Sequence, residues 1–179
     1  MSITLKAIPR ADLEVLAESG VPDSVAGRVA DESMPPSFVA RRALARPEEG
    51  DEACRGGTFY MVRDADHLIV GSCGFKDAPL RGRVEIGYGV SPACRNQGVA
   101  TRAVRELLRL AFASEAVCEV VATVSPGNVA STRVVQKLGF VDGGMILDDD
   151  GEWLVHWVFR KPPDDRLPAT ADAFRILAP

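Results

Sequence analysis

The chain has 179 residues and a net charge of −4, with 46% apolar and 26% charged residues. This is the composition of an ordinary globular protein, and the length fits a single domain. Because there is no basic surplus to neutralise phosphates, we expect no nucleic-acid partner.

The cysteines and histidines argue against a metal site or a disulfide framework. The four cysteines include no CxxC pair, and His67 and His156 lie far apart in the sequence. The N-terminus lacks the apolar core of a signal peptide, and no run approaches the roughly 18 apolar residues of a membrane span. We therefore expect a cytoplasmic protein with no metal and no membrane partner.

The first part of the chain predicts a strand followed by two helices. Residues 2–8 alternate as a short strand does, and residues 9–20 have the spacing of a helix. A second helix is expected over residues 38–46, with Ser37 as its N-terminal cap. The polar residues between the helices are predicted to form a connection.

From residue 58 onward, strand and helix patterns alternate. Period-two runs rich in β-branched and aromatic residues predict strands, and apolar residues at helical spacing predict helices. In chain order these elements are strands over 58–63, 67–75 and 84–90, a helix over 99–112, a strand over 117–124, a helix between Asn128 and Gly139, and strands over 140–147 and 152–160.

This order of elements predicts an α+β fold. Antiparallel strands followed by a strand–helix–strand unit imply a mixed, mostly antiparallel sheet flanked by helices. Residues 1–161 form one domain in this interpretation. Residues 162–179, rich in proline and aspartate at their start, form a C-terminal tail.

The most informative segment runs from Val84 to Thr101, where a strand ends in a tight loop and a long helix begins near Gly98. The first amides of a helix have no partner within the helix, and the helix dipole favours an anion there. Gly98 and Ala100 remove side-chain bulk where a phosphate would approach. Amide bonds to charged oxygens contribute about 1.5–3 kcal/mol each, against about 0.3–2 kcal/mol for the dipole. The segment predicts an anion site made of backbone, although glycines at such a turn can also serve packing alone.

Several short motifs lie in and around this turn. In chain order they are Glu85-Ile-Gly-Tyr88, Val90-Ser-Pro, Arg95-x-x-Gly98-x-Ala100, Asn128-x-x-Ser131 and Val135-Gln-Lys-Leu-Gly-Phe140. Together they resemble the acyl-CoA loop and its flanking elements in the GCN5-related N-acetyltransferase (GNAT) superfamily. They look most like the branch that contains the ribosomal-protein alanine acetyltransferases. The resemblance is close over residues 84–140 and extends less closely over 58–160.

The resemblance implies a sheet that splays between its fourth and fifth strands, with acetyl-CoA as the acyl donor and no metal. The pantetheine arm would enter the gap and extend the sheet by pairing with the backbone around residues 86–90. The cofactor-binding residues that it implies are Tyr88, Val90, Arg95, Asn96, Gln97, Gly98, Val99, Ala100, Thr101, Asn128 and Ser131.

Glu85 is the candidate general base. Strand alternation puts Glu85 and Gly87 on one face and Val84 and Ile86 on the other. A carboxylate in the middle of a strand beside the expected thioester could take the proton of an amine directly or through water. The alternative is a glutamate that only faces solvent or forms a salt bridge.

Ser131 is the second candidate catalytic residue. Many members of the family that the chain resembles have a tyrosine four residues later, as the acid for the departing thiolate, and this chain has Val135 there. Ser131 or bound water would then supply the proton, unless no acid is needed. Packing alone could explain Tyr88, and helix capping alone could explain Asn128. His156 is either an acceptor-pocket residue or an ordinary core or edge histidine.

These observations predict an N-acetyltransferase that moves an acetyl group from acetyl-CoA to a primary amine by direct attack in a ternary complex. The alternatives are a non-catalytic acyl-CoA-binding or regulatory module, or an acyltransferase with another acyl donor or a hydroxyl acceptor. The acceptor is a small-molecule amine or a protein N-terminus. The acidic residues 48–52 could attract a cationic amine or simply be solvated. A homodimer is left open.

Overall fold

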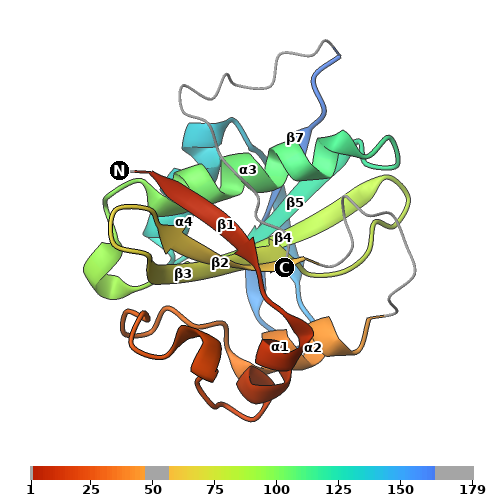
Figure 1. Ribbon diagram of the computed structural model, residues 1–179. Coiled ribbons are helices and arrows are strands. Elements are labelled where there is room, and N and C mark those ends of the chain that lie inside the picture. The colour runs from red at the N-terminus through yellow and green to blue at the C-terminus, as the bar shows by residue number, and fades with distance from the viewer. Residues whose placement is uncertain (1, 47–56, 164–179) are drawn as a thin grey trace.

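The computed structural model describes residues 2–46 and 57–163, and its centre is one seven-stranded sheet (Figure 1). Neighbouring strands are antiparallel except β4 and β5, which are parallel. In sheet order the strands are β1 (Ile3–Ala7), β2 (Thr58–Arg63), β3 (Leu68–Phe75), β4 (Arg83–Val90), β5 (Glu119–Val124), β7 (Trp153–Arg160) and β6 (Val141–Leu147). The predicted α+β class with a mixed, mostly antiparallel sheet is confirmed.

Helices cover both faces of this sheet (Figure 1). On one face, α3 and α4 bury their apolar sides against strand residues such as Ile86 and Trp157, which forms the larger core. On the other face, α1 and α2 pack over Tyr60 of β2 and Ile69 of β3 in a second core. The helices are α1 (Arg10–Ala17), α2 (Ser37–Leu44), α3 (Val99–Ala113) and α4 (Val129–Leu138), with the short 3-10 turns η1 (Asp23–Val25) and η2 (Pro92–Cys94).

The predicted helix caps are confirmed for α4 but not for α2. At α4, the Asn128 side chain accepts a hydrogen bond from the Ser131 amide, and Gly139 ends the helix with a φ of 90°. The prediction for α2 is wrong. Pro36 precedes the helix, Ser37 is its first helical residue, and no side chain of the described residues caps this end. The fixed φ of proline restricts the backbone at the entry to the helix without a side-chain bond.

β4 and β5 are paired only where they begin. Their parallel register consists of three residue pairs: Arg83–Glu119, Val84–Val120 and Glu85–Val121. Beyond these pairs, and within the described residues, β4 continues along β3 alone and β5 along β7 alone. The sheet therefore splays after Glu85, as the resemblance implied, and the β4 backbone over residues 86–90 has a free edge. We call this opening between β4 and β5 the fork.

The described residues contain neither a membrane span nor a metal cluster. None of the helices within 2–46 and 57–163 is long and apolar enough to cross a bilayer. Over the same two stretches, no group of three His, Cys, Asp or Glu side chains is placed to hold a metal ion. The acidic residues 48–52 and most of the predicted tail, residues 164–179, lie outside the described part of the chain.

Candidate active site

The loop between β4 and α3 presents a row of backbone amides that have no partner among the described residues. At one end the Arg95 amide donates to the Pro92 carbonyl, and at the other the Arg102 amide donates to the Gly98 carbonyl. Between them, the amides of residues 96–101 donate no hydrogen bond to any described residue. Gly98 is the N-cap of α3, with a φ of 75°, and it provides no side chain to occupy these donors. The amides are thus available to an anion at a helix N-terminus.

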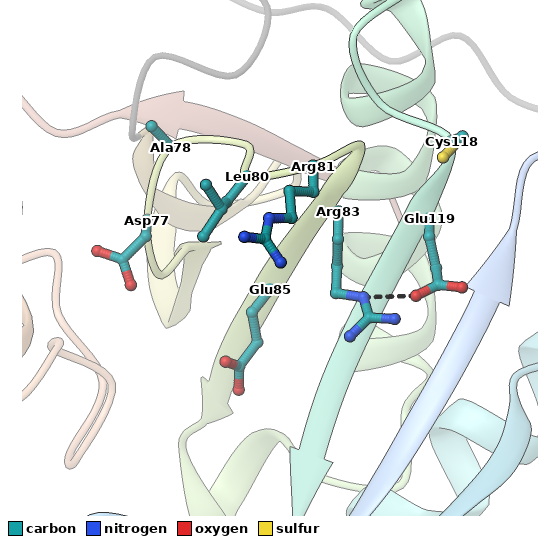
Figure 2. A pocket seen from close by; sticks show the side chains of 8 residues that line it. All are labelled: Asp77, Ala78, Leu80, Arg81, Arg83, Glu85, Cys118 and Glu119. Carbon is teal, nitrogen blue, oxygen red and sulfur yellow. Dashed lines mark hydrogen bonds and ion pairs between the residues drawn. The ribbon is translucent and has the colours of Figure 1, made fainter.

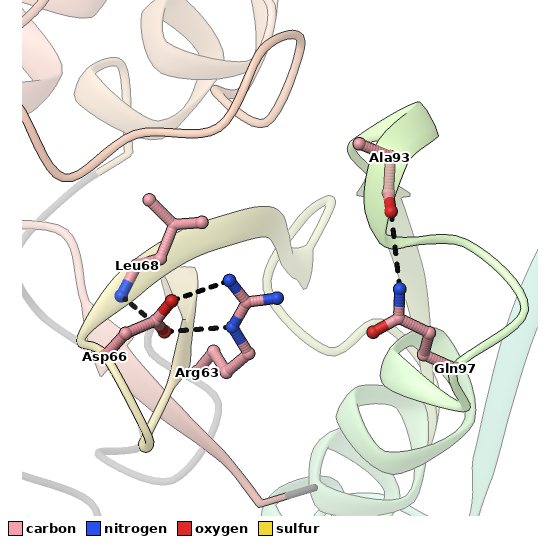
Figure 3. Close-up of polar contacts among 5 residues, drawn as sticks. All are labelled: Arg63, Asp66, Leu68, Ala93 and Gln97. Atoms are coloured by element: carbon pink, nitrogen blue, oxygen red, sulfur yellow. Dashed lines mark hydrogen bonds and ion pairs between the residues drawn. The ribbon is translucent and has the colours of Figure 1, made fainter.

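Side chains of the same loop bond to its carbonyl groups. Gln97 Nε2 donates to the Ala93 carbonyl at 3.3 Å (Figure 3), and Arg102 Nη1 donates to the Gln97 carbonyl at 3.1 Å. Arg95 Nε donates to the carbonyl of Val90, the last residue of β4, at 3.3 Å. Because these bonds use carbonyl oxygens, they stabilise the loop without consuming its amides.

The hairpin between β2 and β3 lies beside this loop (Figure 3). Arg63 Nε and Nη2 donate to the two carboxylate oxygens of Asp66 at 2.9 and 2.7 Å. These hydrogen bonds raise the pKa of Arg63, and the thiol of Cys94, a loop residue, acts in the same direction. An ion-paired arginine therefore neighbours the loop that carries the free amides.

The predicted cofactor residues around the loop contribute in different ways. The side chains of Val99 and Thr101 are buried, so only their amides can meet a ligand. Those of Arg95, Asn96 and Gln97 are exposed. The loop can thus offer a ligand both its backbone amides and the exposed side chains of residues 95–97.

Tyr88 and Ser131 link β4 to the start of α4 beside the fork. The Tyr88 hydroxyl donates to the Ser131 carbonyl at 3.3 Å. Burial raises the pKa of Tyr88, and the hydrogen bond to Ser131 opposes this only in part, so the hydroxyl stays protonated at neutral pH. Asn128 Oδ1 is engaged by the Ser131 amide at 3.0 Å. Val135 is fully buried and offers no hydroxyl.

Glu85 lies where β4 and β5 separate, on the face of the sheet opposite to Tyr88 and α4. Its Oε1 accepts hydrogen bonds from Lys76 Nζ at 2.5 Å and from Thr123 Oγ1 at 2.6 Å. Lys76 Nζ also donates to Thr123 Oγ1 at 3.0 Å. Glu85 is therefore salt-bridged, as one alternative held, but its side chain is 32% exposed, and no described residue donates to Oε2.

Lys76 and Thr123 are the site residues that sequence reasoning missed. Lys76 follows the last residue of β3, and its amide donates to the Glu85 carbonyl at 2.7 Å. Pairing between the neighbouring predicted strands 67–75 and 84–90 could have suggested this neighbour. Thr123 comes from β5, 38 residues away from Glu85, and no local pattern pointed to it.

A pocket of about 640 Å³ adjoins Glu85 at the closed end of the fork (Figure 2). Arg83 donates to Glu119 Oε1 at 2.5 Å, and Arg160 donates to Glu119 Oε2 at 3.3 Å. These ion pairs join β4, β5 and β7 at the end where the strands remain together. They hold the base of the fork closed while its other end is open.

His156 shares the face that carries Glu85. It pairs with Thr123 across β5 and β7, and directly paired residues point to the same side of a sheet. The residue is half-buried. This position, one strand away from the Glu85 cluster, keeps the acceptor-pocket alternative open for His156.

Comparisons with known proteins agree with this geometry. Residues 2–141 match the family described as Acetyltransferase (GNAT) domain. The uncharacterized N-acetyltransferase YjdG of Bacillus subtilis is 28% identical over 103 residues, which are 57% of this chain and 58% of that protein. The probable N-acetyltransferase YjcK of the same organism is 31% identical over 124 residues, 65% of this chain and 66% of that protein. The chain thus matches about half to two thirds of the length of its curated relatives.

Solved structures share the fold. The aminoglycoside acetyltransferase AAC(6')-Ib in complex with coenzyme A has a TM-score of 0.62 at 18% identity and covers 89% of this chain and 95% of that chain. A chimera of the spermidine N-acetyltransferase SpeG from Vibrio cholerae has a TM-score of 0.62 at 17% identity, covering 89% and 96%. At these identities the likeness concerns the fold alone. Because the family match spans most of the chain and the forked sheet fits it, this protein belongs to the GNAT acetyltransferase family.

Proposed function

We propose that this protein is an acetyl-CoA-dependent N-acetyltransferase, which transfers an acetyl group to a primary amine by direct attack in a ternary complex. The observation that carries the proposal concerns the part of the chain that the structure describes: the amides of residues 96–101 have no partner there, and they lie beside a fork whose β4 edge is free. A diphosphate needs an anion site of this kind, and an extended amide-containing arm needs an open strand edge. The relatives named as N-acetyltransferases support the same activity.

The residues on both sides of the fork fit acetyl-CoA. The amides of residues 96–101 would bind the diphosphate, and Arg95 would help to hold the loop in shape. The free edge over residues 86–90 would pair with the pantetheine arm. Tyr88 of β4 bonds to Ser131 at the adjacent start of α4, and with Asn128 these residues would contact the same arm. The proposal includes no metal.

Acyl transfer to an amine requires a neutral amine, a polarised carbonyl and a proton for the leaving thiolate. We assign Glu85 as the base, with Oε2 taking a proton from the acceptor ammonium. The neutral nitrogen then attacks the acetyl carbon, the carbon–sulfur bond breaks, and the nitrogen releases its second proton. That proton reaches the departing thiolate through the Ser131 hydroxyl or water, so that coenzyme A leaves as the thiol. A backbone amide on the free β4 edge would polarise the carbonyl.

The charges near the fork bear on the class of acceptor. Lys76 neutralises Glu85. Arg83 and Arg160 neutralise Glu119. Because these carboxylates already have cationic partners, they attract a cationic acceptor weakly, which favours an amine with a larger neutral fraction. At pH 7 an α-amine is neutral roughly a tenth of the time, whereas a lysine amine is neutral only about once in several thousand molecules.

We therefore favour a protein N-terminus as the acceptor, of the kind used by the ribosomal-protein alanine acetyltransferases. A small-molecule amine is the alternative. It has the support of two structural neighbours, which by their names are an aminoglycoside acetyltransferase and a spermidine acetyltransferase.

A non-catalytic acyl-CoA-binding module is the second candidate function. The observation that favours it is Val135, which is fully buried where many relatives in the wider superfamily carry a catalytic tyrosine. Such a module would keep the loop amides and the fork but would have no need of Glu85. The same fold could also accept another acyl donor or a hydroxyl acceptor.

Thiol release from acetyl-CoA across an amine panel distinguishes these functions. The panel contains a peptide that begins with alanine, the same peptide with a blocked N-terminus, spermidine and an aminoglycoside. We expect turnover on the free peptide and none on the blocked one. Calorimetric titration with coenzyme A runs in parallel. Binding without turnover on any amine would favour the non-catalytic module, and absence of binding would contradict the loop assignment.

The base is tested by Glu85→Gln, which keeps the size of the side chain and removes its basicity. We expect turnover at neutral pH to fall by about a hundredfold or more, because general base catalysis contributes about 10²–10⁴-fold. Affinity for coenzyme A should stay nearly unchanged. Glu115→Gln, at an exposed position between α3 and β5, is the matched control. An unaltered rate in Glu85→Gln would remove Glu85 from the mechanism.

A further inference from the structure

A closed triangle of hydrogen bonds holds one oxygen of Glu85 at the fork. Oε1 accepts from Lys76 Nζ at 2.5 Å and from Thr123 Oγ1 at 2.6 Å, and the third side runs from Lys76 Nζ to Thr123 Oγ1 at 3.0 Å. The three side chains come from the end of β3, from β4 and from β5. The triangle therefore spans the point at which the sheet divides.

The chemistry of these groups fixes where the hydrogens lie. A lysine ammonium can only donate, so Thr123 accepts from Lys76, and the one hydroxyl hydrogen of Thr123 is left for Glu85. Oε1 thus receives two donors, and hydrogen bonds to a charged carboxylate are roughly twice as strong as those between neutral groups. Any rotation of the carboxylate would break both bonds. Its second oxygen, Oε2, is therefore held in one direction.

Lys76 is itself held along its length. The Lys76 amide donates to the Glu85 carbonyl at 2.7 Å, and the Lys76 carbonyl accepts a hydrogen bond from the guanidinium of Arg46. Its Cε lies 3.8 Å from the place where a Cβ on Gly87 would be, so the stem runs along β4 toward the fork. The Lys76 side chain is 29% exposed. A side chain already restricted in this way loses little further entropy when it holds Glu85.

We propose that Lys76 and Thr123 are positioning residues for the reaction, which fix the Glu85 carboxylate so that only Oε2 is presented to the acceptor amine. The inference rests on the proposed function of Glu85 as the base. When the acceptor ammonium gives its proton to Oε2, both hydrogen bonds to Oε1 persist, so the carboxylate does not reorient during the transfer. Binding of acetyl-CoA by the loop amides does not involve the triangle.

Thr123 offers a clean pair of variants. Thr123→Val keeps the shape of the side chain and removes the hydroxyl, whereas Thr123→Ser keeps the hydroxyl. We expect Thr123→Val to lower kcat by about ten- to a hundredfold, since misplacement of a catalytic group costs up to about 10²-fold. Thr123→Ser should restore most of the rate. KM for acetyl-CoA and Tm should stay close to wild type in both, measured with the best acceptor of the amine panel.

Lys76 is tested by Lys76→Met, which retains a long apolar stem without the charge. Lys6→Met, at an exposed position on β1, controls for the loss of a lysine. We expect Lys76→Met to lower kcat to a similar extent as Thr123→Val and to leave coenzyme A affinity unchanged. In a Glu85→Gln background Lys76→Met should cause no further loss, because residues that act through one group are not additive.

Three results would overturn the proposal. The first is wild-type kcat in Thr123→Val and Lys76→Met when Glu85→Gln has lost activity. The second is a full additional loss from Lys76→Met in the Glu85→Gln background. The third is a parallel fall of Tm or of coenzyme A affinity, since the triangle would then be structural. If Glu85→Gln itself keeps the wild-type rate, the base assignment fails first and the positioning role fails with it.

Discussion

At the start of α3, the backbone of a single residue favours glycine. Gly98 has a φ of 75°, which side chains rarely adopt, whereas the Arg102 guanidinium, 2.7 Å from the place of a Cβ, ends a flexible side chain that can move away. Gly98→Glu adds a negative charge beside the amides of residues 96–101. We expect coenzyme A affinity to fall by about a hundredfold or more, because each lost amide bond to a charged oxygen is worth about 1.5–3 kcal/mol. Calorimetric titration measures the change.

Gly151 provides the matched control for this variant. It lies in the turn between β6 and β7 with a φ of 80°, and a Cβ there would meet nothing within 4 Å. Gly151→Glu therefore introduces the same side chain at a similarly left-handed residue outside the loop, and affinity should be unchanged. Equal losses in both variants would point to strain or charge in general. Retained affinity in Gly98→Glu would contradict the assigned diphosphate site.

Single residues of this site were predictable to the extent that local structure determines them. The free amides of residues 98–101 follow from a helix N-terminus alone, those of 96 and 97 belong to the loop before it, and strand alternation placed Glu85 on its correct face. The partners of Glu85 were not predictable in the same way. Thr123 reaches it through the parallel pairing of β4 and β5, whose register no local pattern encodes.

Among the elements, α4 has an N-terminal residue with two separable roles. Asn128 Oδ1 accepts the Ser131 amide at 3.0 Å, and loss of such a cap costs about 0.5–2 kcal/mol. Asn128→Ala removes the cap and the amide group, whereas Asn128→Ser restores a capping oxygen without the amide. We expect Asn128→Ala to lower both Tm and coenzyme A affinity. Asn128→Ser should recover Tm but not affinity; recovery of both would reduce Asn128 to a helix cap.

Helices and strands that depend on local sequence were predictable, whereas features that depend on the pairing of distant strands were not. β2 has the predicted bounds of 58–63, and α4 lies between the predicted residues Asn128 and Gly139, because periodicity and caps are local. The start of α2 differs because Pro36 replaces a side-chain cap. The fork depends on pairing between strands whose first residues are 36 apart, so only the family resemblance implied it.

For the molecule as a whole, one part of the sheet is covered by helices and another part carries the candidate site. The core under α1 and α2 covers β2 and β3, where Asp12 accepts hydrogen bonds from Tyr60 at 3.1 Å and from Ser24 at 2.7 Å. This buried network ties α1 and η1 to β2. Glu85, on β4, keeps about a third of its side chain exposed. An acceptor can therefore reach the carboxylate while β2 and β3 stay covered by α1 and α2.

The chain has two tyrosines, and each links a strand to a helix: Tyr60 links β2 to α1, and Tyr88 links β4 to α4. Burial raises the pKa of Tyr60, and the carboxylate of Asp12 adds to the effect. Burial also raises the pKa of Tyr88. In an unfolded chain tyrosine ionises near pH 10, so above about pH 10 the unfolded state loses protons that the folded state keeps. The stabilisation from both groups is therefore present below about pH 10 and is lost as the pH rises through the folded-state values.

An alkaline titration tests this linkage for the folded protein. We expect tyrosinate absorbance to appear together with the loss of far-UV circular dichroism, because neither phenol ionises readily while it is buried. Stability should fall by up to about 1.4 kcal/mol per pH unit for each tyrosine above about pH 10. In Tyr88→Phe, the remaining absorbance reports Tyr60 alone, which burial and the Asp12 carboxylate hold in the neutral form. Ionisation of Tyr60 near pH 10 with circular dichroism intact would mean that the contact between α1 and β2 is open in solution.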